Sequence, residues 1–160
     1  MPASYKELVL LTQQLHQAHR GAMAAELAAR GLGEVGHPIL LTLLQDFNEG
    51  GEGRCGTQRE LAVLLNISPA AAANSLKSLE RGGYIVREPR QGDARRNQVT
   101  LTDKGRRAVS GCQEAFDAVA QRMLADFTPE EREQMVAFRR RMLANLGPWI
   151  RYPSNEKEDT

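Results

Sequence analysis

Apolar residues recur at steps of three and four along three long stretches of the chain, residues 4–30, 102–126 and 129–146. This spacing puts them on one face of an α-helix, so each stretch is predicted to be a long helix. The stripes are narrow, closer to a coiled-coil seam than to the broad face of a core helix. Their members are Leu8, Leu11, Leu15, Ala18 and Ala22 in the first stretch, Val109, Cys112, Phe116, Val119, Met123 and Phe127 in the second, and Met135, Phe138, Met142 and Leu146 in the third.

A helix of different character is predicted after the first long stretch. Gly31-Leu32-Gly33 interrupts the helical pattern, and His37-Pro38 begins a new one, with proline tolerated in a first turn. Its apolar residues are Ile39, Leu40, Leu43, Leu44 and Phe47. Because they cover more of the helix circumference, this helix is expected to be buried behind the elements that follow.

Two short helices are predicted in the middle of the chain. Thr57 and Glu60 have the spacing of a capping box, in which each side chain accepts a hydrogen bond from an otherwise unpaired amide of the first turn. Leu61, Leu64 and Leu65 then give the first short helix one apolar face.

The second short helix is marked at both ends. Ser68 is a good N-cap, and Pro69 suits the first helical position. The helix is predicted to run to about Arg81, where Gly82-Gly83 stops it. Two helices joined by a turn of a few residues form a helix-turn-helix.

A β-hairpin is predicted directly after these helices. Residues 84–87 and 98–101 read as strands, the second with clean alternation of apolar and polar residues. The ten residues between them, 88–97, are polar and basic and contain turn-forming proline and glycine. Residues 54–56 are expected to add a short third strand. A basic hairpin that follows a helix-turn-helix is a wing.

This central segment resembles the MarR family of winged-helix transcriptional regulators. The resemblance rests on the pattern Leu79-Glu80-x-x-Gly83-Tyr84-Ile85, followed by Asp93-x-Arg95-x-x-x-Val99-x-Leu101-Thr102-x-x-Gly105. The expected fold is therefore mainly α with a small β-wing, in which a winged helix-turn-helix head is joined to long terminal helices that form a dimerisation bundle. The resemblance implies a homodimer, a pseudo-palindromic double-stranded DNA operator and a small amphipathic or phenolic effector.

The same reading divides the chain into four parts. Residues 1–33 form an N-terminal dimerisation helix, residues 34–101 the DNA-binding head, residues 102–150 the C-terminal dimerisation helices, and residues 151–160 a polar tail. The long helices carry more apolar surface than so small a head can cover. A two-fold dimer is the most economical way to bury it.

The distribution of charge supports nucleic-acid binding. The chain has a formal net charge of only +1. Residues 54–110, however, contain eleven Lys/Arg and five Asp/Glu, a net charge of +6, and leave −5 on the rest of the chain. A basic centre in acidic surroundings is typical of a nucleic-acid-binding face, although a solvated charged surface has the same count.

Candidate DNA contacts lie on the second short helix, on the start of the first and in the wing. Ser68, Pro69, Ala70 and Ala71 bring the helix start close to a phosphate, and the two alanines suit a thymine methyl group. Asn74 suits an adenine edge. The predicted backbone contacts are Thr57, Gln58, Arg59, Lys77, Arg81, Arg90 and Arg96. By the resemblance, Arg95 is the minor-groove arginine of the wing, which Asp93 orients.

An effector crevice is expected between the head and the long helices, as the resemblance implies. Its candidate lining residues are His16, His19, Arg20 and Phe47. No cofactor or metal is expected, because His16 and His19 stand three apart without a third ligand. The sequence contains no signal peptide and no membrane-spanning run, which predicts a cytoplasmic protein.

Three other functions, an enzyme, a redox sensor and a protein-binding module, would each require different features in the sequence. No P-loop, GxSxG or HExxH motif is present, so the chain is not expected to be an enzyme. A cysteine-based redox sensor would use Cys55 or Cys112, although Cys112 falls on the apolar stripe and reads as a small core residue. A winged-helix module that binds protein instead of DNA should lack the arginine cluster of this wing.

Overall fold

The chain forms six helices and a two-stranded sheet within the part that the structure describes. This computed structural model describes residues 4–49, 58–90 and 93–147, with the backbone alone for residues 47–49, 89–90 and 93–98. The elements are α1 (Tyr5–Ala29), α2 (Pro38–Glu49), α3 (Gln58–Leu64), α4 (Pro69–Arg81), β1 (Ile85–Arg90), β2 (Asp93–Leu101), α5 (Asp103–Met123) and α6 (Pro129–Asn145). The predicted mainly α fold with a small wing is confirmed.

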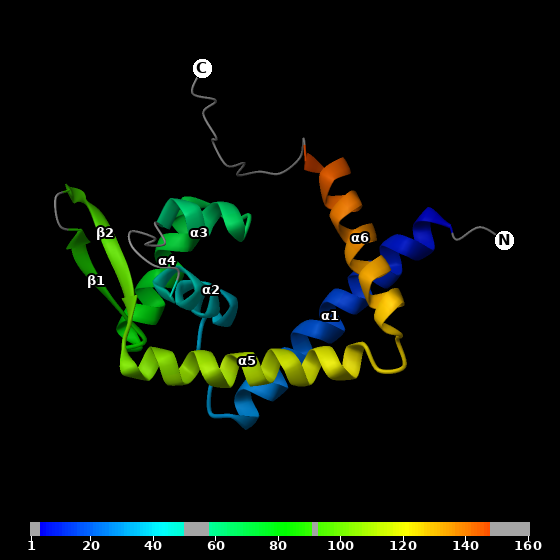
Figure 1. Cartoon of the computed structure of the whole chain (residues 1–160), viewed down its shortest axis with the longest axis horizontal. Coiled ribbons are helices and arrows are strands. Elements are labelled where there is room, and N and C mark those ends of the chain that lie inside the picture. The colour runs from blue at the N-terminus through cyan, green and yellow to red at the C-terminus, as the bar shows by residue number, and fades with distance from the viewer. Residues whose placement is uncertain (1–3, 50–57, 91–92, 148–160) are drawn as a thin grey trace, which may run out of the picture.

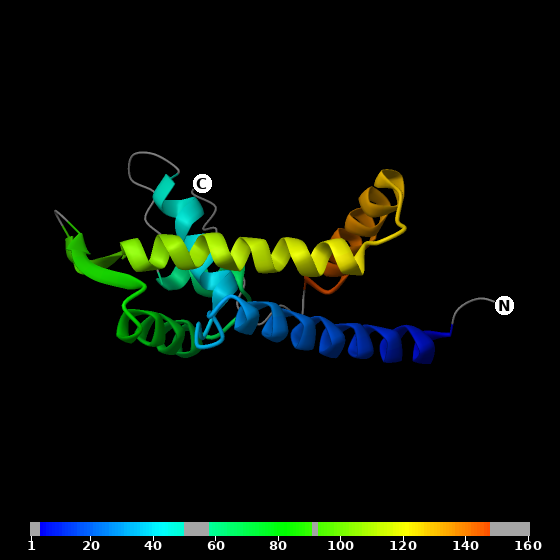
Figure 2. The same cartoon turned by 90° about the horizontal axis from the view of Figure 1, so that it is seen from below.

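The elements separate into a head and an extension. Helices α2, α3 and α4 gather with the β1–β2 ribbon at one end of the molecule (Figure 1). Helix α5 runs from the base of this ribbon to the other end, where α1 and α6 project beyond the head (Figures 1 and 2). Helix α1 packs against α5, and α2 packs against α5 from within the head.

Local capping explains where most helices begin. The hydroxyl groups of Ser4, Ser68, Thr102 and Thr128 each accept a hydrogen bond from the amide three residues later. These bonds satisfy amides that have no partner within the helix. At Thr128 the capping box is complete, because its amide donates to the carboxylate of Glu131 at 2.8 Å. The capping box predicted at Thr57 lies outside the described residues.

Helix α2 begins at a histidine instead of a hydroxyl residue. The amide of Leu40 donates to Nδ1 of His37 at 3.3 Å. Burial lowers the pKa of His37, which keeps the imidazole neutral and able to accept this bond. A protonated ring would place positive charge at the positive end of the helix dipole, so the same geometry disfavours it.

One hydrophobic core lies where α2 meets α5. Leu40, Leu41 and Leu44 of α2 are fully buried, as are Val109 and Cys112 of α5. The core also takes in the predicted inward residues of α4 and of the ribbon, Leu76, Leu79, Val99 and Leu101. The expectation that the apolar face of α2 is buried is therefore confirmed for Leu40, Leu41 and Leu44.

Most of the predicted apolar stripe of α5 is buried within the chain. Val109, Cys112 and Val119 are buried, Phe127 is 41% exposed, and α1 and α2 pack against the helix. Gly105, Ala108 and Ala115 widen the buried face. The helix ends at Met123, earlier than predicted, and Asp126 beyond it adopts a left-handed conformation with φ of 65°. An apolar stripe in a sequence predicts that one face of a helix packs against something, but it does not identify the partner.

One smaller prediction, the inner face of α3, is also wrong. Leu64 was placed on the inner face of α3 but is 59% exposed, and Ala62 is buried in its place. Helix α3 has only seven residues, so Leu61 and Ala62 suffice to anchor it and the next leucine faces solvent. Steps of three and four in so short a helix do not determine which residue turns inward.

The wing strands are longer than predicted. Pairing extends to Arg90 and Asp93, so the predicted ten-residue connection shortens to residues 91–92. Pro89 lies inside β1, where the register shifts between it and Arg90. Residues 88–97 contain no regular alternation of apolar and polar residues, so the pattern predicted no strand there. The third strand predicted at residues 54–56 lies outside the described residues.

The head is joined to α5 at a close backbone contact. Gly105, in the first turn of α5, faces the carbonyl group of Tyr84, and a Cβ added there would overlap the carbonyl oxygen. The amide of Thr102 donates to the same oxygen at 3.1 Å. The spacing Thr102-x-x-Gly105 is therefore a structural requirement, because threonine caps the helix and glycine permits its approach.

We predict that Gly105→Ala lowers the free energy of unfolding by about 3 kcal/mol, because backbone atoms must move to admit the methyl group. Urea denaturation followed by circular dichroism measures this. Gly21→Ala is the control, since a Cβ there meets nothing within 4 Å inside α1. That change should raise stability by about 0.5–1 kcal/mol. Equal effects of the two substitutions would contradict the close-contact interpretation.

Candidate nucleic-acid interface and ligand cavity

Helix α4 presents one exposed side along its whole length. Leu76 and Leu79 face the core, and the exposed residues Ala70, Asn74 and Lys77 follow each other at steps of four and three. Arg81 continues this line in the last turn. The four form a stripe with methyl, amide and cationic groups, which we call the α4 stripe.

The start of α4 is held by α3. The side-chain amide of Gln58 donates to the carbonyl oxygen of Pro69 at 3.2 Å. Ser68 is half-buried in its capping role, Ala71 is half-buried, and Pro69 is exposed. Arg59 is exposed on α3, whereas Thr57 lies outside the described residues. The predicted contacts of the helix-turn-helix thus lie together at the junction of α3 and α4.

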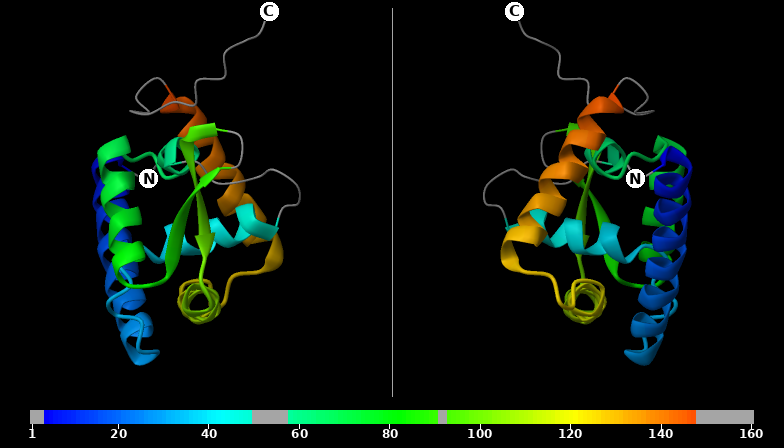
Figure 3. Two further views of the ribbon diagram at one scale, coloured as in Figure 1. Left: turned by 90° about the vertical axis from the view of Figure 1, so that its left-hand side faces the viewer. Right: turned by 90° about the vertical axis from the view of Figure 1, so that its right-hand side faces the viewer.

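The wing stands beside α4 at the same end of the molecule (Figures 1 and 3). Arg90, Asp93, Arg95 and Arg96 lie in its distal half, and Arg90 pairs with Asp93 in the register of the ribbon. Only the backbone is described at these positions. Three arginines therefore lie close together in the half of the ribbon that is farther from the rest of the head.

The C-terminal end of α4 is secured by Lys104, which the sequence analysis did not single out, and by Thr102. Nζ of Lys104 donates to the carbonyl oxygen of Gly82 at 2.6 Å and lies 4.6 Å from the centre of the Tyr84 ring. The hydroxyl of Thr102 donates to the carbonyl oxygen of Gly83 at 2.6 Å. A cation at this end of a helix also complements its dipole. The motif Thr102-x-x-Gly105 was a signal for this junction.

A cavity of about 1000 Å³ lies between α1, α2 and α5. Three of the predicted crevice residues, His16, His19 and Arg20, line it. The rest of the wall is mainly apolar and includes Met23, Leu27, Val35, Pro38, Ile39, Phe116, Ala120 and Met123. The fourth predicted residue, Phe47, lies in the last turn of α2, where only the backbone is described.

A second hollow of about 530 Å³ separates α1 from α6. Leucines of α1 and Met142 of α6 line it, together with Arg139 and the same two histidines, His16 and His19. The histidines therefore stand at the boundary between the two hollows. Among the described residues, no group of three or more His, Cys, Asp or Glu side chains is arranged to hold a metal ion.

Comparison with known proteins identifies the relatives of this fold. A sequence profile of the MarR family matches residues 48–96, from the end of α2 into β2. YdgJ of Bacillus subtilis, an uncharacterised HTH-type transcriptional regulator, is 33% identical over 107 residues, which are 67% of this chain and 62% of YdgJ. The chain belongs to the MarR family.

Solved structures extend this likeness over nearly the whole chain. The S. aureus MepR–DNA complex contains a chain that is 28% identical, with a TM-score of 0.70 over 89% of this chain and 96% of that one. A MarR protein from Peptoclostridium difficile is 18% identical, with a TM-score of 0.76 over 94% of each chain, which shows the fold alone. YdgJ is named as a transcriptional regulator, in agreement with the expectation that this MarR-family protein is not an enzyme.

The sequence matches are shorter than the structural ones. The chain covers 62% of the length of YdgJ and 52% of that of YwaE, a second B. subtilis regulator. No described helix of this MarR-family protein is both long enough and apolar enough to cross a membrane.

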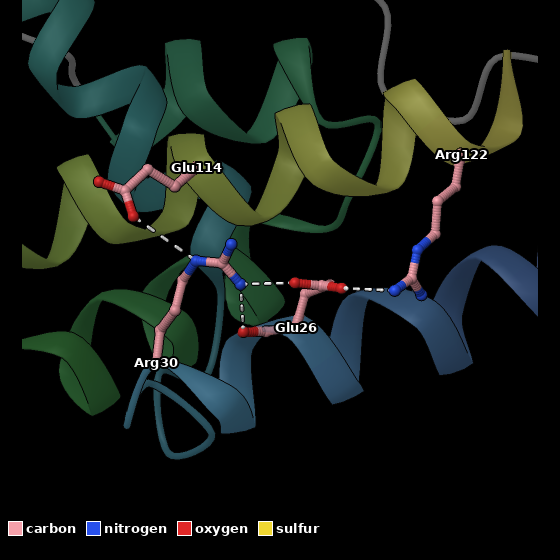
Figure 4. A network of polar contacts seen from close by, with 4 residues as sticks. All are labelled: Glu26, Arg30, Glu114 and Arg122. Atoms are coloured by element: carbon pink, nitrogen blue, oxygen red, sulfur yellow. Dashed lines mark hydrogen bonds and ion pairs between the residues drawn. The ribbon is translucent and has the colours of Figure 1, made fainter. Parts of the chain in front are cut away.

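A chain of charged residues ties α1 to α5 (Figure 4). Glu26 contacts Arg30 at 2.6 Å and Arg122 at 3.8 Å, and Arg30 also contacts Glu114 at 3.6 Å. The hydrogen bond from Arg30 lowers the pKa of Glu26, so the carboxylate stays charged. Leu27, the neighbour of Glu26, lines the cavity. The ion pairs thus brace the two helices that form the cavity walls.

Cys112 is a core residue of this MarR-family protein. Its side chain is fully buried in the cluster between α2 and α5. Burial raises the pKa of the thiol, so the protonated form predominates at neutral pH. Since the thiolate is the reactive form, the geometry argues against Cys112 as an oxidant sensor. The other candidate, Cys55, lies outside the described residues.

We predict that Cys112 resists alkylation by iodoacetamide in the native protein and reacts only as fast as the core opens. A Cys55→Ser variant isolates its signal, and mass spectrometry measures the rate. Addition of urea should accelerate the reaction in proportion to the unfolded fraction. A native rate close to that of a free cysteine would contradict the assignment to the core.

Proposed function

We propose that this MarR-family protein is a transcriptional regulator, and most simply a repressor, that binds double-stranded DNA as a homodimer and responds to a small amphipathic effector. The observation that carries the proposal is the α4 stripe, exposed beside a basic wing. The stripe has the width and chemistry to enter a major groove, and an arginine-rich ribbon suits the adjacent minor groove. The MepR–DNA complex, whose protein is similar to this chain, supports the same reading.

Each residue of the proposed surface has a chemical role. Asn74 reads an adenine edge, and Ala70 and Ala71 contact thymine methyl groups. The first amides of α4, capped by Ser68, face a phosphate. Arg95 enters the minor groove, with Asp93 orienting the wing. The proposed backbone contacts are Thr57, Gln58, Arg59, Pro69, Lys77, Arg81, Arg90 and Arg96, of which Gln58 acts in addition by holding α3 against α4.

The proposed dimer uses the parts of α1 and α6 that the chain leaves uncovered. In the first half of α1, Tyr5 is 82% and Leu11 is 55% exposed. On α6, Phe138 and Leu143 are 57% and 62% exposed. Contiguous apolar surface of this kind marks an interaction site, and two-fold pairing is the commonest closed assembly. Two α4 helices related in this way suit a pseudo-palindromic operator with half-sites about one helical turn apart.

The cavity suits an apolar effector that carries an acidic group. Its walls are mainly aliphatic, aromatic and thioether side chains, while His16, His19 and Arg20 offer hydrogen-bond donors or positive charge. No Asp or Glu is among its described lining residues. Because α5 forms one wall and is fastened to the end of α4, an occupant that displaces α5 also displaces the α4 stripe.

Binding experiments on DNA test the proposal. A duplex selected from a random library by the wild-type protein is compared with a random-sequence duplex by fluorescence anisotropy. Asn74→Ala should weaken binding to the selected duplex by about 1–3 kcal/mol and hardly affect the random one. Lys77→Ala should weaken both similarly and reduce the salt dependence of binding by about one unit of slope. Affinity independent of salt would instead indicate a protein-binding module.

Light scattering tests the dimer. We expect a particle of twice the 17.7 kDa mass of one chain at micromolar concentration. Phe138→Glu should shift it toward the monomer, because a carboxylate would be buried without a partner. Leu64→Glu is the control, since that leucine is as exposed as Phe138 but lies on α3 in the head. A monomeric wild-type protein, or a control that dissociates equally, would refute this interface.

A further inference from the structure

A charged residue occupies an inward position of the wing. Ile85 and Arg87 lie on the same face of β1, and their register partners on β2 are Leu101 and Val99. Those three aliphatic neighbours are buried, and the Arg87 side chain is only 19% exposed. A guanidinium therefore stands where the alternation of the ribbon calls for an aliphatic side chain.

The guanidinium of Arg87 reaches across to α4. Nη2 donates a long hydrogen bond to the carbonyl oxygen of Ala73 at 3.5 Å, and Nε lies 3.5 Å from a carboxylate oxygen of Glu80. Nε is fully buried and makes no hydrogen bond to any described residue. The arginine is thus held between two points that are seven residues, or about two turns, apart on one side of α4.

These two points lie between the buried and the exposed sides of α4. At about 100° per residue, Ala73 and Glu80 lie about a quarter turn from Leu76 and Leu79, which face the core. The α4 stripe begins on the other side of the same line, with Lys77 nearest to it. Directional contacts here oppose rotation of the helix about its own axis, in addition to the packing of Leu76 and Leu79.

We infer that Arg87 is a positioning residue that sets the rotation of α4 relative to the wing, and so determines DNA sequence specificity without touching a base. The inference rests on the proposed DNA-binding function. The Arg87–Glu80 ion pair, with side chains 19% and 44% exposed, contributes little net stability compared with aliphatic packing, but its directional contacts favour one arrangement. The side chains of the α4 stripe depend on that arrangement, because base-edge hydrogen bonds require correct distance and direction.

The alternative role for Arg87 is a direct phosphate contact, and the two roles give different results. A phosphate contact contributes equally on every sequence, so its loss weakens binding to selected and random duplexes alike and lowers the salt slope on both. Loss of a positioning contact weakens binding to the selected duplex and leaves the random duplex with its original affinity and salt slope.

The test compares Arg87→Leu with Arg107→Leu on the selected and random duplexes described above. Leucine suits the inward position, so the melting temperature should be maintained. The ratio of selected to random affinity should fall at least about tenfold for Arg87→Leu. Arg107 is exposed on α5, so its replacement removes the same charge and should leave the ratio unchanged. Arg87→Lys should recover only part of the ratio, because lysine lacks the planar fork.

A double-mutant cycle tests the contact itself. Glu80→Gln should lower the ratio in the same direction, and combined with Arg87→Leu it should cause no additional loss. This variant also tests the pair if Arg87→Leu does not fold. A folded Arg87→Leu protein that retains the wild-type ratio, or one that loses affinity equally on both duplexes, overturns the inference alone. A wild-type protein that binds no duplex overturns the proposed function as well.

Discussion

The approach of α5 to the backbone of Tyr84 is the constraint on which the head depends. Three elements meet there: α4 ends shortly before Tyr84, β1 begins directly after it, and Gly105 lies in the first turn of α5. Only a residue without Cβ fits at position 105. The side chains of Thr102 and Lys104 donate hydrogen bonds to the carbonyl groups of Gly83 and Gly82, which directly follow α4. Helix α4 and the wing are therefore held from one side by a single helix.

Helix α5 contributes to both the core and the cavity wall. The middle of α5 fills the core with Val109 and Cys112, and its later turns line the cavity with Phe116 and Met123. Packed interiors transmit displacement because they contain few voids. Helix α5 is thus continuous from the cavity wall to the junction with the end of α4, and the ion pair of Glu26 with Arg122 joins α1 to the same helix.

Much of this fold follows from sequence because its signals are local. Hydroxyl caps at Ser68, Thr102 and Thr128 involve residues three apart, and the amphipathic patterns of α1 and α4 repeat within the helices themselves. The proposed DNA-reading residues likewise follow from their place on α4. The strand extent of the wing did not follow, since residues 88–97 are polar and show no periodic alternation.

The sequence by itself determined the order of the elements, most of the helix starts and the inward leucines of α4, because capping and periodicity depend on neighbours in the chain. Only the tertiary structure decided which apolar stripe is buried within the chain: that of α5 is covered from Val109 to Val119, whereas that of α6, with Phe138, is exposed. It also decided that Arg87 turns inward toward Glu80. Apolarity and charge follow from the residue type alone. The surface that packs against each residue depends on contacts between distant parts of the chain.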